Sequence, residues 1–191
     1  PNAHVRRLVS GGTRLRLPWA SRVDWLDKNP DRVVALLESL KDDSSTMVRR
    51  SVANNLNDLG KARPELLIRT AKRWLEGASP ERRKLVEHAL RGAVKRGDKD
   101  ALVLLGYGQS PRVAVEKVAF NPLRVAIGGR VAMAFVLRSR SKAHQRVLVD
   151  AAVHFVKARG AARPKVFKLG RFDLAPGERI ELGTRFSLGV H

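Results

Sequence analysis

The chain of 191 residues contains no cysteine, and this absence excludes several kinds of chemistry at once. Without thiols there are no disulfides, no thiolate zinc site, no iron–sulfur cluster and no cysteine nucleophile. The five histidines are scattered without metal-ligand spacing, so we expect neither a metal nor another cofactor. A chain without disulfides is typical of a reducing compartment. The expected location is the cytoplasm, close to the nucleoid if the source is bacterial.

The sequence also lacks a long hydrophobic run. No stretch approaches the roughly 18 to 20 residues of a membrane span, and the first twenty residues lack the apolar segment of a signal peptide. Hydrophobic residues make up 43% of the chain and charged residues 29%, which is enough apolar material for a folded core. We therefore expect a soluble, folded protein of one large or two small domains, without a membrane partner.

Acidic residues are scarce relative to basic ones. There are 38 lysines and arginines against 18 aspartates and glutamates, so the formal net charge is +20. Residues 101–191 carry +11 of it and residues 1–100 carry +9, so both halves are basic. This distribution favours an extended polyanion as partner, and nucleic acid, either DNA or RNA, is the leading prediction. A generally basic protein without such a partner, or an adaptor for an acidic protein, is the alternative.

Up to about residue 106, apolar residues recur at spacings of three and four, which is typical of amphipathic helices. The periodic runs lie at residues 33–40, 48–59, 66–75 and 85–93. Prolines with capping residues and acids precede several runs, as in Asn29-Pro30-Asp31. Short connections favour a stack of antiparallel helix pairs over residues 1–108.

From about residue 112 the hydrophobic period changes to two, which predicts strands. β-branched and aromatic residues dominate residues 113–120, 131–137, 146–156 and 164–169, and a turn follows at Pro176-Gly177. This spacing is that of a β-sandwich. We expect the linker at residues 106–111 and the β domain at residues 112–191, incomplete at its C-terminus.

The helical half contains an internal repeat. Val5-Arg6-Arg7 aligns with Val48-Arg49-Arg50 at an offset of 43 residues, and that segment aligns with Arg82-Arg83-Lys84 at an offset of 34. Offsets near 40 are typical of HEAT or armadillo units, of which the chain would hold about two and a half to three. Stacked units set equivalent helices side by side, so we expect the arginine pairs to form a ladder that binds phosphates. Alternatively, each arginine bonds the acids of a neighbouring repeat and only holds the stack.

Five segments, in this order, resemble the HEAT-like-repeat DNA alkylation repair glycosylases, in particular the AlkC branch. They are HVRRL at residues 4–8, TRLRLPWA at 13–20, VRRSVANNLNDL at 48–59, VHFVKA at 153–158 and PKVFKL at 164–169. The resemblance implies a HEAT-like α-solenoid followed by an antiparallel immunoglobulin-like β-sandwich. It also implies that the chain is the central part of a longer enzyme.

The activity implied by the resemblance is hydrolysis of the N-glycosidic bond of a cationic, N-alkylated base. The partner that it implies is double-stranded DNA carrying such bases, bound by a monomer. A cationic base is already a good leaving group, so the reaction needs no general acid. It needs a carboxylate that stabilises the oxocarbenium-like sugar and orients water, and an aromatic face that holds the base by a cation–π contact.

The resemblance assigns these roles to particular residues of this chain. Asp58 matches the active-site carboxylate and Trp19 the aromatic residue of the pocket. Asp58 could instead be a helix-surface acid paired with Lys61, and Trp19 a core aromatic. Asn54 and Asn55 lie on the helix of Asp58, where they could face the groove, bond a phosphate or bond a neighbouring repeat. The residues expected to bind DNA are Arg6, Arg7, Arg14, Arg16, Arg49, Arg50, Asn54, Asn55, Arg82 and Arg83.

One departure from the family pattern concerns the chemistry directly. The family reads Ser-Glu-Gly before Thr13-Arg14, with a Glu thought to be catalytic, whereas this chain reads Ser10-Gly11-Gly12. A second departure is Leu15, where the family tends to have Pro. Gly11 falls on Asn54 at the 43-residue offset, so we expect Gly11 and Asp58 to face one cavity. Two hypotheses follow: a DNA glycosylase that uses Asp58 and Trp19, or a DNA-binding scaffold without catalysis.

Overall fold

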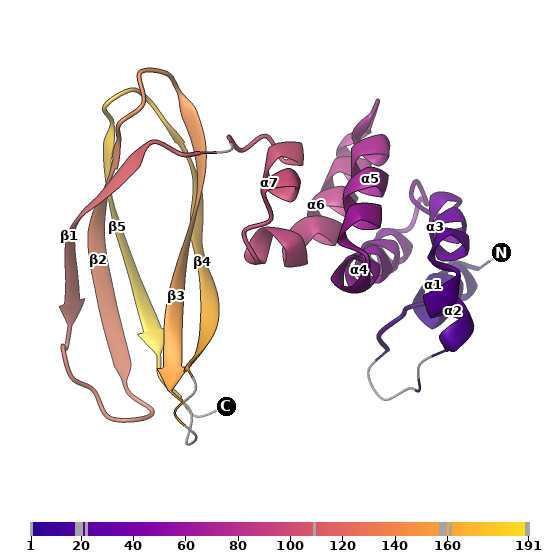
Figure 1. The fold of residues 1–191 in the computed structure, drawn as a ribbon, viewed down its shortest axis with the longest axis horizontal. Coiled ribbons are helices and arrows are strands. Elements are labelled where there is room, and N and C mark those ends of the chain that lie inside the picture. The colour runs from indigo at the N-terminus through magenta and orange to yellow at the C-terminus, as the bar shows by residue number, and fades with distance from the viewer. Residues whose placement is uncertain are drawn as a thin grey trace. The chain divides into compact units, whose positions relative to one another are not determined.

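The structure is a computed structural model that describes residues 2–17, 21, 23–108, 110–156, 160 and 162–189. The chain divides into a helical unit, Pro1–Leu105, and a β unit, Gly106–His191 (Figure 1). This is the predicted fold class, α and β in separate domains. The division falls at the start of the segment where the sequence predicts a linker.

Seven helices make up the described part of the helical unit. They are α1 (Ala3–Gly12), α2 (Asp24–Lys28), α3 (Pro30–Glu38), α4 (Thr46–Ala62), α5 (Pro64–Leu75), α6 (Pro80–Lys95) and α7 (Lys99–Leu104). Proline opens α3, α5 and α6, where its fixed φ suits a helix start and its missing N–H has no helical partner to lose. The Ser79 hydroxyl accepts the N–H of Arg82 at 3.2 Å and so caps α6.

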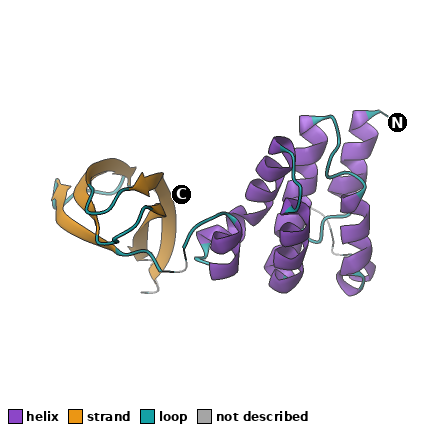
Figure 2. Ribbon diagram, turned by 90° about the horizontal axis from the view of Figure 1, so that it is seen from above, coloured by secondary structure: helices purple, strands orange, loops and turns teal. Residues whose placement is uncertain are grey.

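The repeat read from the sequence corresponds to a layer of three helices. Helix α4 packs against α1 and α6, and these are the helices that carry the aligned arginine pairs. Helix α5 connects α4 to α6 and packs against both. The helices of this unit lie side by side in Figure 2. Val48, Val52 and Leu56 are fully buried at spacings of four, so the core-facing stripe of α4 holds the layer together.

Five antiparallel strands form the described part of the β unit. They are β1 (Val113–Asn121), β2 (Arg130–Ser139), β3 (Gln145–Val156), β4 (Ala162–Leu174) and β5 (Arg179–Ser187). One sheet has the order β1-β2-β5, and β3 pairs with β4 in the other. Phe135 and Leu137 of the first sheet pack with Val147 and Leu174 of the second to form the core. In the described ranges, no helix is long and apolar enough to cross a membrane.

Candidate nucleic-acid interface

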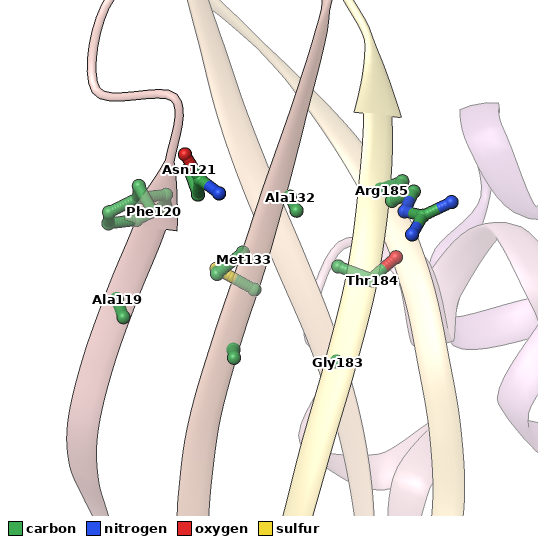
Figure 3. Close-up of a pocket in the computed structure, with 9 residues that line it drawn as sticks. Ala119, Phe120, Asn121, Ala132, Met133, Gly183, Thr184 and Arg185 are labelled. Carbon is green, nitrogen blue, oxygen red and sulfur yellow. The ribbon is translucent and has the colours of Figure 1, made fainter.

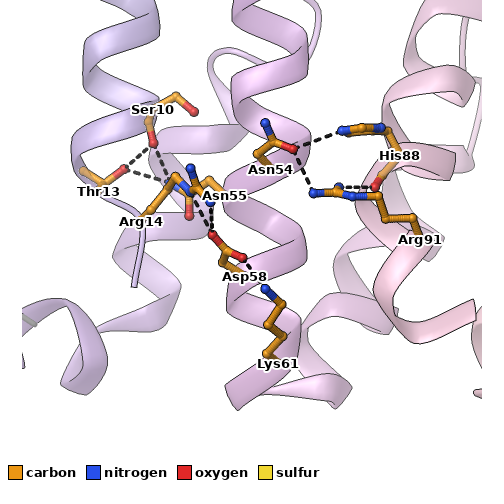
Figure 4. Close-up of polar contacts among 9 residues, drawn as sticks. All are labelled: Ser10, Thr13, Arg14, Asn54, Asn55, Asp58, Lys61, His88 and Arg91. Atoms are coloured by element: carbon orange, nitrogen blue, oxygen red, sulfur yellow. Dashed lines mark hydrogen bonds and ion pairs between the residues drawn. The ribbon is translucent and has the colours of Figure 1, made fainter. Parts of the chain in front are cut away.

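Helix α4 presents polar side chains to both of its neighbours (Figure 4). On the side of α1, the buried Asn55 amide donates hydrogen bonds to the Ser10 carbonyl at 2.8 Å and to Thr13 Oγ1 at 3.0 Å. The carbonyls of the last helical turn have no partner within their own helix. Asn55 therefore fastens the end of α1 and sets the path of the chain that follows it.

Two further asparagines of α4 bond α6. Asn54 Oδ1 accepts a hydrogen bond from Arg91 at 2.9 Å and lies 3.0 Å from His88 Nε2. Asn57 Oδ1 accepts the N–H of Gly92 at 3.1 Å. Asn55 thus bonds a neighbouring repeat, and Asn54 both bonds a neighbouring repeat and lines a groove described below.

Asp58 lies beneath Arg14 and is buried, with a side chain 3% exposed. Arg14 donates to Asp58 Oδ2 through Nε at 2.8 Å and through a second guanidinium nitrogen, while Lys61 donates to Oδ1 at 2.8 Å. Burial raises the pKa of Asp58, but the hydrogen bonds from Lys61 and Arg14 outweigh it and the pKa is lowered. Asp58 is therefore an ionised carboxylate at neutral pH, and it has the Lys61 pairing that the sequence left open.

A groove beside Gly11, of about 540 Å³, runs between α1 and α4. We call it the Gly11 groove. Its lining consists of Arg7, Leu8, Gly11, Gly12, Arg14, Leu17, Met47, Arg50, Ser51 and Asn54. Among these described lining residues there is no carboxylate. Asp58 is not part of this lining. Arg14 lines the groove and is bonded to Asp58, so it lies between the groove and the carboxylate. The expectation that Gly11 and Asp58 face one cavity is therefore wrong.

The first arginine of two pairs holds neighbouring repeats together. Arg6 of α1 bonds Asp43 at 2.5 and 2.9 Å, and Arg82 of α6 bonds Asp42 at 2.6 and 2.7 Å. The two aspartates are adjacent in the turn before α4, so this turn clamps both flanking helices. The pKa values of Asp42 and Asp43 are lowered, chiefly by these hydrogen bonds. For Arg6 and Arg82, the structure thus shows the alternative named above, in which an arginine bonds the acids of a neighbouring repeat and holds the stack together.

The remaining predicted residues have diverse surroundings. Arg49 donates to the carbonyls of Asp43 at 2.5 Å and Ser44 at 2.9 Å, whereas Arg50 is exposed and lines the Gly11 groove. Arg83 is exposed and donates to the Ala78 carbonyl at 3.3 Å, and Arg16 is exposed. Trp19 lies outside the described residues.

A second groove, of about 410 Å³, lies between α4 and α6 and shares Arg50 with the first. Its other basic residues are Arg49, Lys84 and His88. Burial and the charges of Arg91 and Arg50 lower the pKa of His88. Burial also lowers the pKa of Arg91; the charge of Asp58 raises it, and the charges of Arg14 and Arg50 lower it further. The lowered pKa leaves His88 neutral at pH 7, so the positive charge of this groove comes from Arg49, Arg50 and Lys84, and Glu81 is an acid in the same lining.

The sequence reading missed His88 and Arg91, although the repeat contained a signal for them. At the 34-residue offset, His88 falls on Asn54 and Arg91 on Asn57. Equivalent positions of stacked helices are neighbours, so polar residues there are candidates for bonding across the layer.

The β unit has a depression of its own, of about 540 Å³, on the three-stranded sheet (Figure 3). Three neighbouring strands line it with mostly small residues, around Ala119, Ala134 and Gly183. Phe120 and Arg185 lie at its borders and are exposed. It contains no acid, and within the described ranges no cluster of His, Asp and Glu could hold a metal ion.

The two units define a class of protein: HEAT-like helical repeats followed by an immunoglobulin-like β domain. Residues 114–190 match the family model of the uncharacterised protein YhaZ, C-terminal Ig-like domain. The chain is 40% identical over 177 residues to "Uncharacterized protein YhaZ" of Bacillus subtilis (strain 168), an alignment that covers 93% of this chain and 49% of that protein.

A comparison with solved structures supports the same class of protein. The Pseudomonas fluorescens alkylpurine DNA glycosylase AlkC, bound to DNA containing an abasic site analog, matches with a TM-score of 0.95 and 36% identity. This match covers 100% of our chain and 53% of that one, so the chain spans about half the length of these relatives. The resemblance read from the sequence is therefore confirmed, and so is the predicted fold class.

Proposed function

We propose that this chain binds duplex DNA on the face formed by α1, α4 and α6, and that it acts in the repair of alkylated DNA. The observation that carries the proposal is the match, along the whole chain, to a DNA glycosylase in its DNA-bound form. The net charge of +20 supports it independently, because phosphate neutralisation supplies most of the affinity of such complexes.

The proposed contacts with DNA begin with the exposed arginines of the groove. Within the described part of the chain, Arg7 and Arg50 bond no other side chain, so their guanidinium groups are available to phosphates. Arg6 and Arg82 contribute mainly by bonding α1 and α6 to the turn before α4, and Arg49 by bonding the carbonyls of that turn. Phosphate contacts of this kind position the duplex and carry no sequence information.

The reaction proposed for the protein is hydrolysis of the N-glycosidic bond of a cationic N-alkylated base. Asp58 is the carboxylate for it, because its lowered pKa keeps it ionised where positive charge develops on the sugar. In the present arrangement Arg14 covers Asp58. A DNA phosphate that attracts Arg14 would expose the carboxylate. Trp19 is the proposed clamp for the base.

A second candidate function is a DNA-binding scaffold without catalysis. The observation in its favour is the Gly11 groove, whose described lining contains three arginines and no carboxylate. Asp58, the nearest acid to Arg14, is already bonded through both oxygens. A scaffold would retain the basic face and the β unit and recruit or protect damaged DNA.

Single-turnover release of a methylated base from duplex DNA separates the two candidates. The glycosylase predicts release above the uncatalysed rate and its loss in Asp58→Asn, while Glu65→Gln, which removes an exposed carboxylate from α5, leaves release unchanged. Tight DNA binding without release favours the scaffold. Absence of DNA binding in the folded protein contradicts both.

A further inference from the structure

We propose that His88 takes up a proton when a phosphate group enters the groove between α4 and α6, so that this groove binds anions more tightly as the pH falls. We call it the α4–α6 groove; it is the cavity of about 410 Å³ described above. The inference rests on the proposed function in one respect, because the phosphate that it names belongs to the DNA backbone. It goes further by assigning to this groove a titratable side chain that neither the proposed DNA contacts nor the proposed reaction uses.

The contacts of Asn54 determine which nitrogen of His88 carries hydrogen (Figure 4). Arg91 donates to Asn54 Oδ1 at 2.9 Å, and only the oxygen of an amide can accept from a guanidinium. His88 Nε2 lies 3.0 Å from the same oxygen, so Nε2 carries hydrogen and donates. In the neutral ring Nδ1 is then the basic nitrogen, and it has no hydrogen-bond partner among the described residues.

His88 belongs to a lining that is rich in cations. Arg49, Arg50 and Lys84 line the α4–α6 groove with it, and Glu81 is the one acid of the described lining. In the described part of the chain Arg50 and Lys84 bond no acid, and Arg49 donates to carbonyl and hydroxyl oxygens, which carry no charge. A phosphate group therefore has the charge that this lining lacks.

Without an anion, the surroundings of His88 favour the neutral ring. Burial lowers the pKa of His88, and the positive charges of Arg91 and Arg50 lower it further. The remaining charged groups of the lining, on both helices, are Arg49, Lys84 and Glu81. A further positive charge on the ring is unfavourable as long as these cations outnumber the acids around it.

An oxyanion bound by Arg50 changes this balance in two ways. It offsets the charge of Arg50, and it places negative charge close to the ring, and both effects favour the protonated imidazole. Protonation occurs at Nδ1, so the bond from Nε2 to Asn54 stays in place and the ring gains a second donor. Coupling between two bound species is reciprocal, so protonation of His88 strengthens anion binding by the same factor.

Affinity for the anion should increase as the pH falls. The pKa of His88 is lowered in the chain alone and rises when the anion binds, so binding takes up protons at pH values between the two. Affinity increases as the pH falls through that interval, and it is constant above the higher value and below the lower one. A site built only of arginines and lysines would show no such dependence near neutral pH.

Nuclear magnetic resonance of the imidazole rings, recorded from pH 5 to pH 8 with and without sulfate, tests the inference on the chain. Sulfate is the probe because it is a tetrahedral oxyanion whose charge is constant over this range, and chloride keeps the ionic strength equal. We expect sulfate to raise the titration midpoint of His88, and the affinity for sulfate to be about tenfold higher at pH 5 than at pH 8.

Two arginine variants show whether the effect belongs to the groove. Arg50→Ala should raise the midpoint of His88 without sulfate, because it removes a positive neighbour, and should abolish most of the response to sulfate. Arg69→Ala is the matched control, because it removes an exposed arginine of α5 that does not line the α4–α6 groove, and it should change neither.

A duplex provides the second arm of the test. Calorimetric binding of an unmodified duplex near pH 6, in two buffers of different protonation enthalpy, should show net proton uptake by the parent chain. His88→Gln keeps a donor for Asn54 without a titratable ring, so it should bind the duplex with less proton uptake. Glu81→Gln should tighten binding of sulfate and duplex at every pH and should leave the uptake that depends on His88 in place.

Two results would overturn the inference while leaving DNA binding intact. One is a titration midpoint of His88 that sulfate does not move. The other is a duplex that binds with equal proton uptake in the parent chain and in His88→Gln. Failure of the folded chain to bind any duplex would instead overturn the proposed function, while the sulfate titration would still decide whether the α4–α6 groove links anion binding to His88.

Discussion

Gly11→Glu is the substitution that tests the proposed chemistry most sharply. It adds a carboxylate to a groove that has three arginines and no acid among its described lining residues. Glu is a better helix former than Gly by several tenths of a kcal/mol, and the nearest atom to the new Cβ is 3.9 Å away. The variant should therefore fold at least as stably as the parent chain.

The expected gain in rate follows from where the charge would lie. If a DNA phosphate draws Arg14 away from Asp58, that carboxylate opens to the Gly11 groove, and a second carboxylate at position 11 would face the same developing charge on the sugar. One preorganised contact of this kind is typically worth about 3 kcal/mol. That energy corresponds to roughly a hundredfold in rate. We expect Gly11→Glu to raise excision of a cationic alkylated base by about this factor, with little change in affinity for undamaged DNA.

The assay is single-turnover release of the methylated base at saturating protein. Gly11→Gln is the matched control, because it adds the same shape without the charge and should give little or no gain. Asp58→Asn in the Gly11→Glu background should reduce the rate again. If Gly11→Glu shows no gain although it is folded and bound to DNA, the claim of a vacant catalytic position fails and the scaffold is favoured.

Four further predictions concern binding and stability. If the protein neutralises about six phosphates, the logarithm of its affinity for DNA should fall with the logarithm of the salt concentration at a slope near −5. A slope shallower than about −2 would contradict a DNA-binding groove. Arg50→Ala should weaken binding to methylated and unmodified duplex alike, whereas Arg49→Ala should lower the melting temperature because it loses its bonds to the turn before α4. Deleting residues 112–191 should raise the dissociation constant more than it lowers single-turnover cleavage; the reverse would mean that the β unit builds the active site. Burial raises the pKa of Glu38, but hydrogen bonds from Trp74, Arg73 and Lys41 lower it to about 2, so its stabilising contribution is full above pH 4.5 and is lost as the pH falls toward about 2. Melting temperatures between pH 5 and pH 2 should fall less steeply in Glu38→Gln than in the parent; parallel curves would contradict this.

The elements of the fold could be predicted because local patterns determine them. The change of hydrophobic period near residue 112 separates the two units, and the prolines before α3, α5 and α6 mark the helix starts. The offsets of 43 and 34 residues identified α1, α4 and α6 as equivalent helices, and these three form one layer. Helix α7 and the exact strand ends had no comparable signal, since six residues contain too few periods to measure.

The site was less predictable because its contacts join distant segments. Nothing in the order of residues says that Arg14 covers Asp58, or that the adjacent Asp42 and Asp43 bond arginines of two different helices. An arginine can pair with many acids or carbonyl groups, and the packing of α1, α4 and α6 determines which of these lie within reach. The sequence could therefore name the arginine pairs but could not divide them into those that hold the stack and those that face the groove.

The central claim is that the α1, α4 and α6 face binds duplex DNA. Hydrogen–deuterium exchange, measured on the chain with and without a saturating duplex, tests it most directly. The account predicts slower exchange in peptides that contain Arg7, Arg50 and Asn54, and unchanged exchange along α5. Slower exchange confined to α5, or no change in α1, α4 and α6 while the duplex is demonstrably bound, would contradict it.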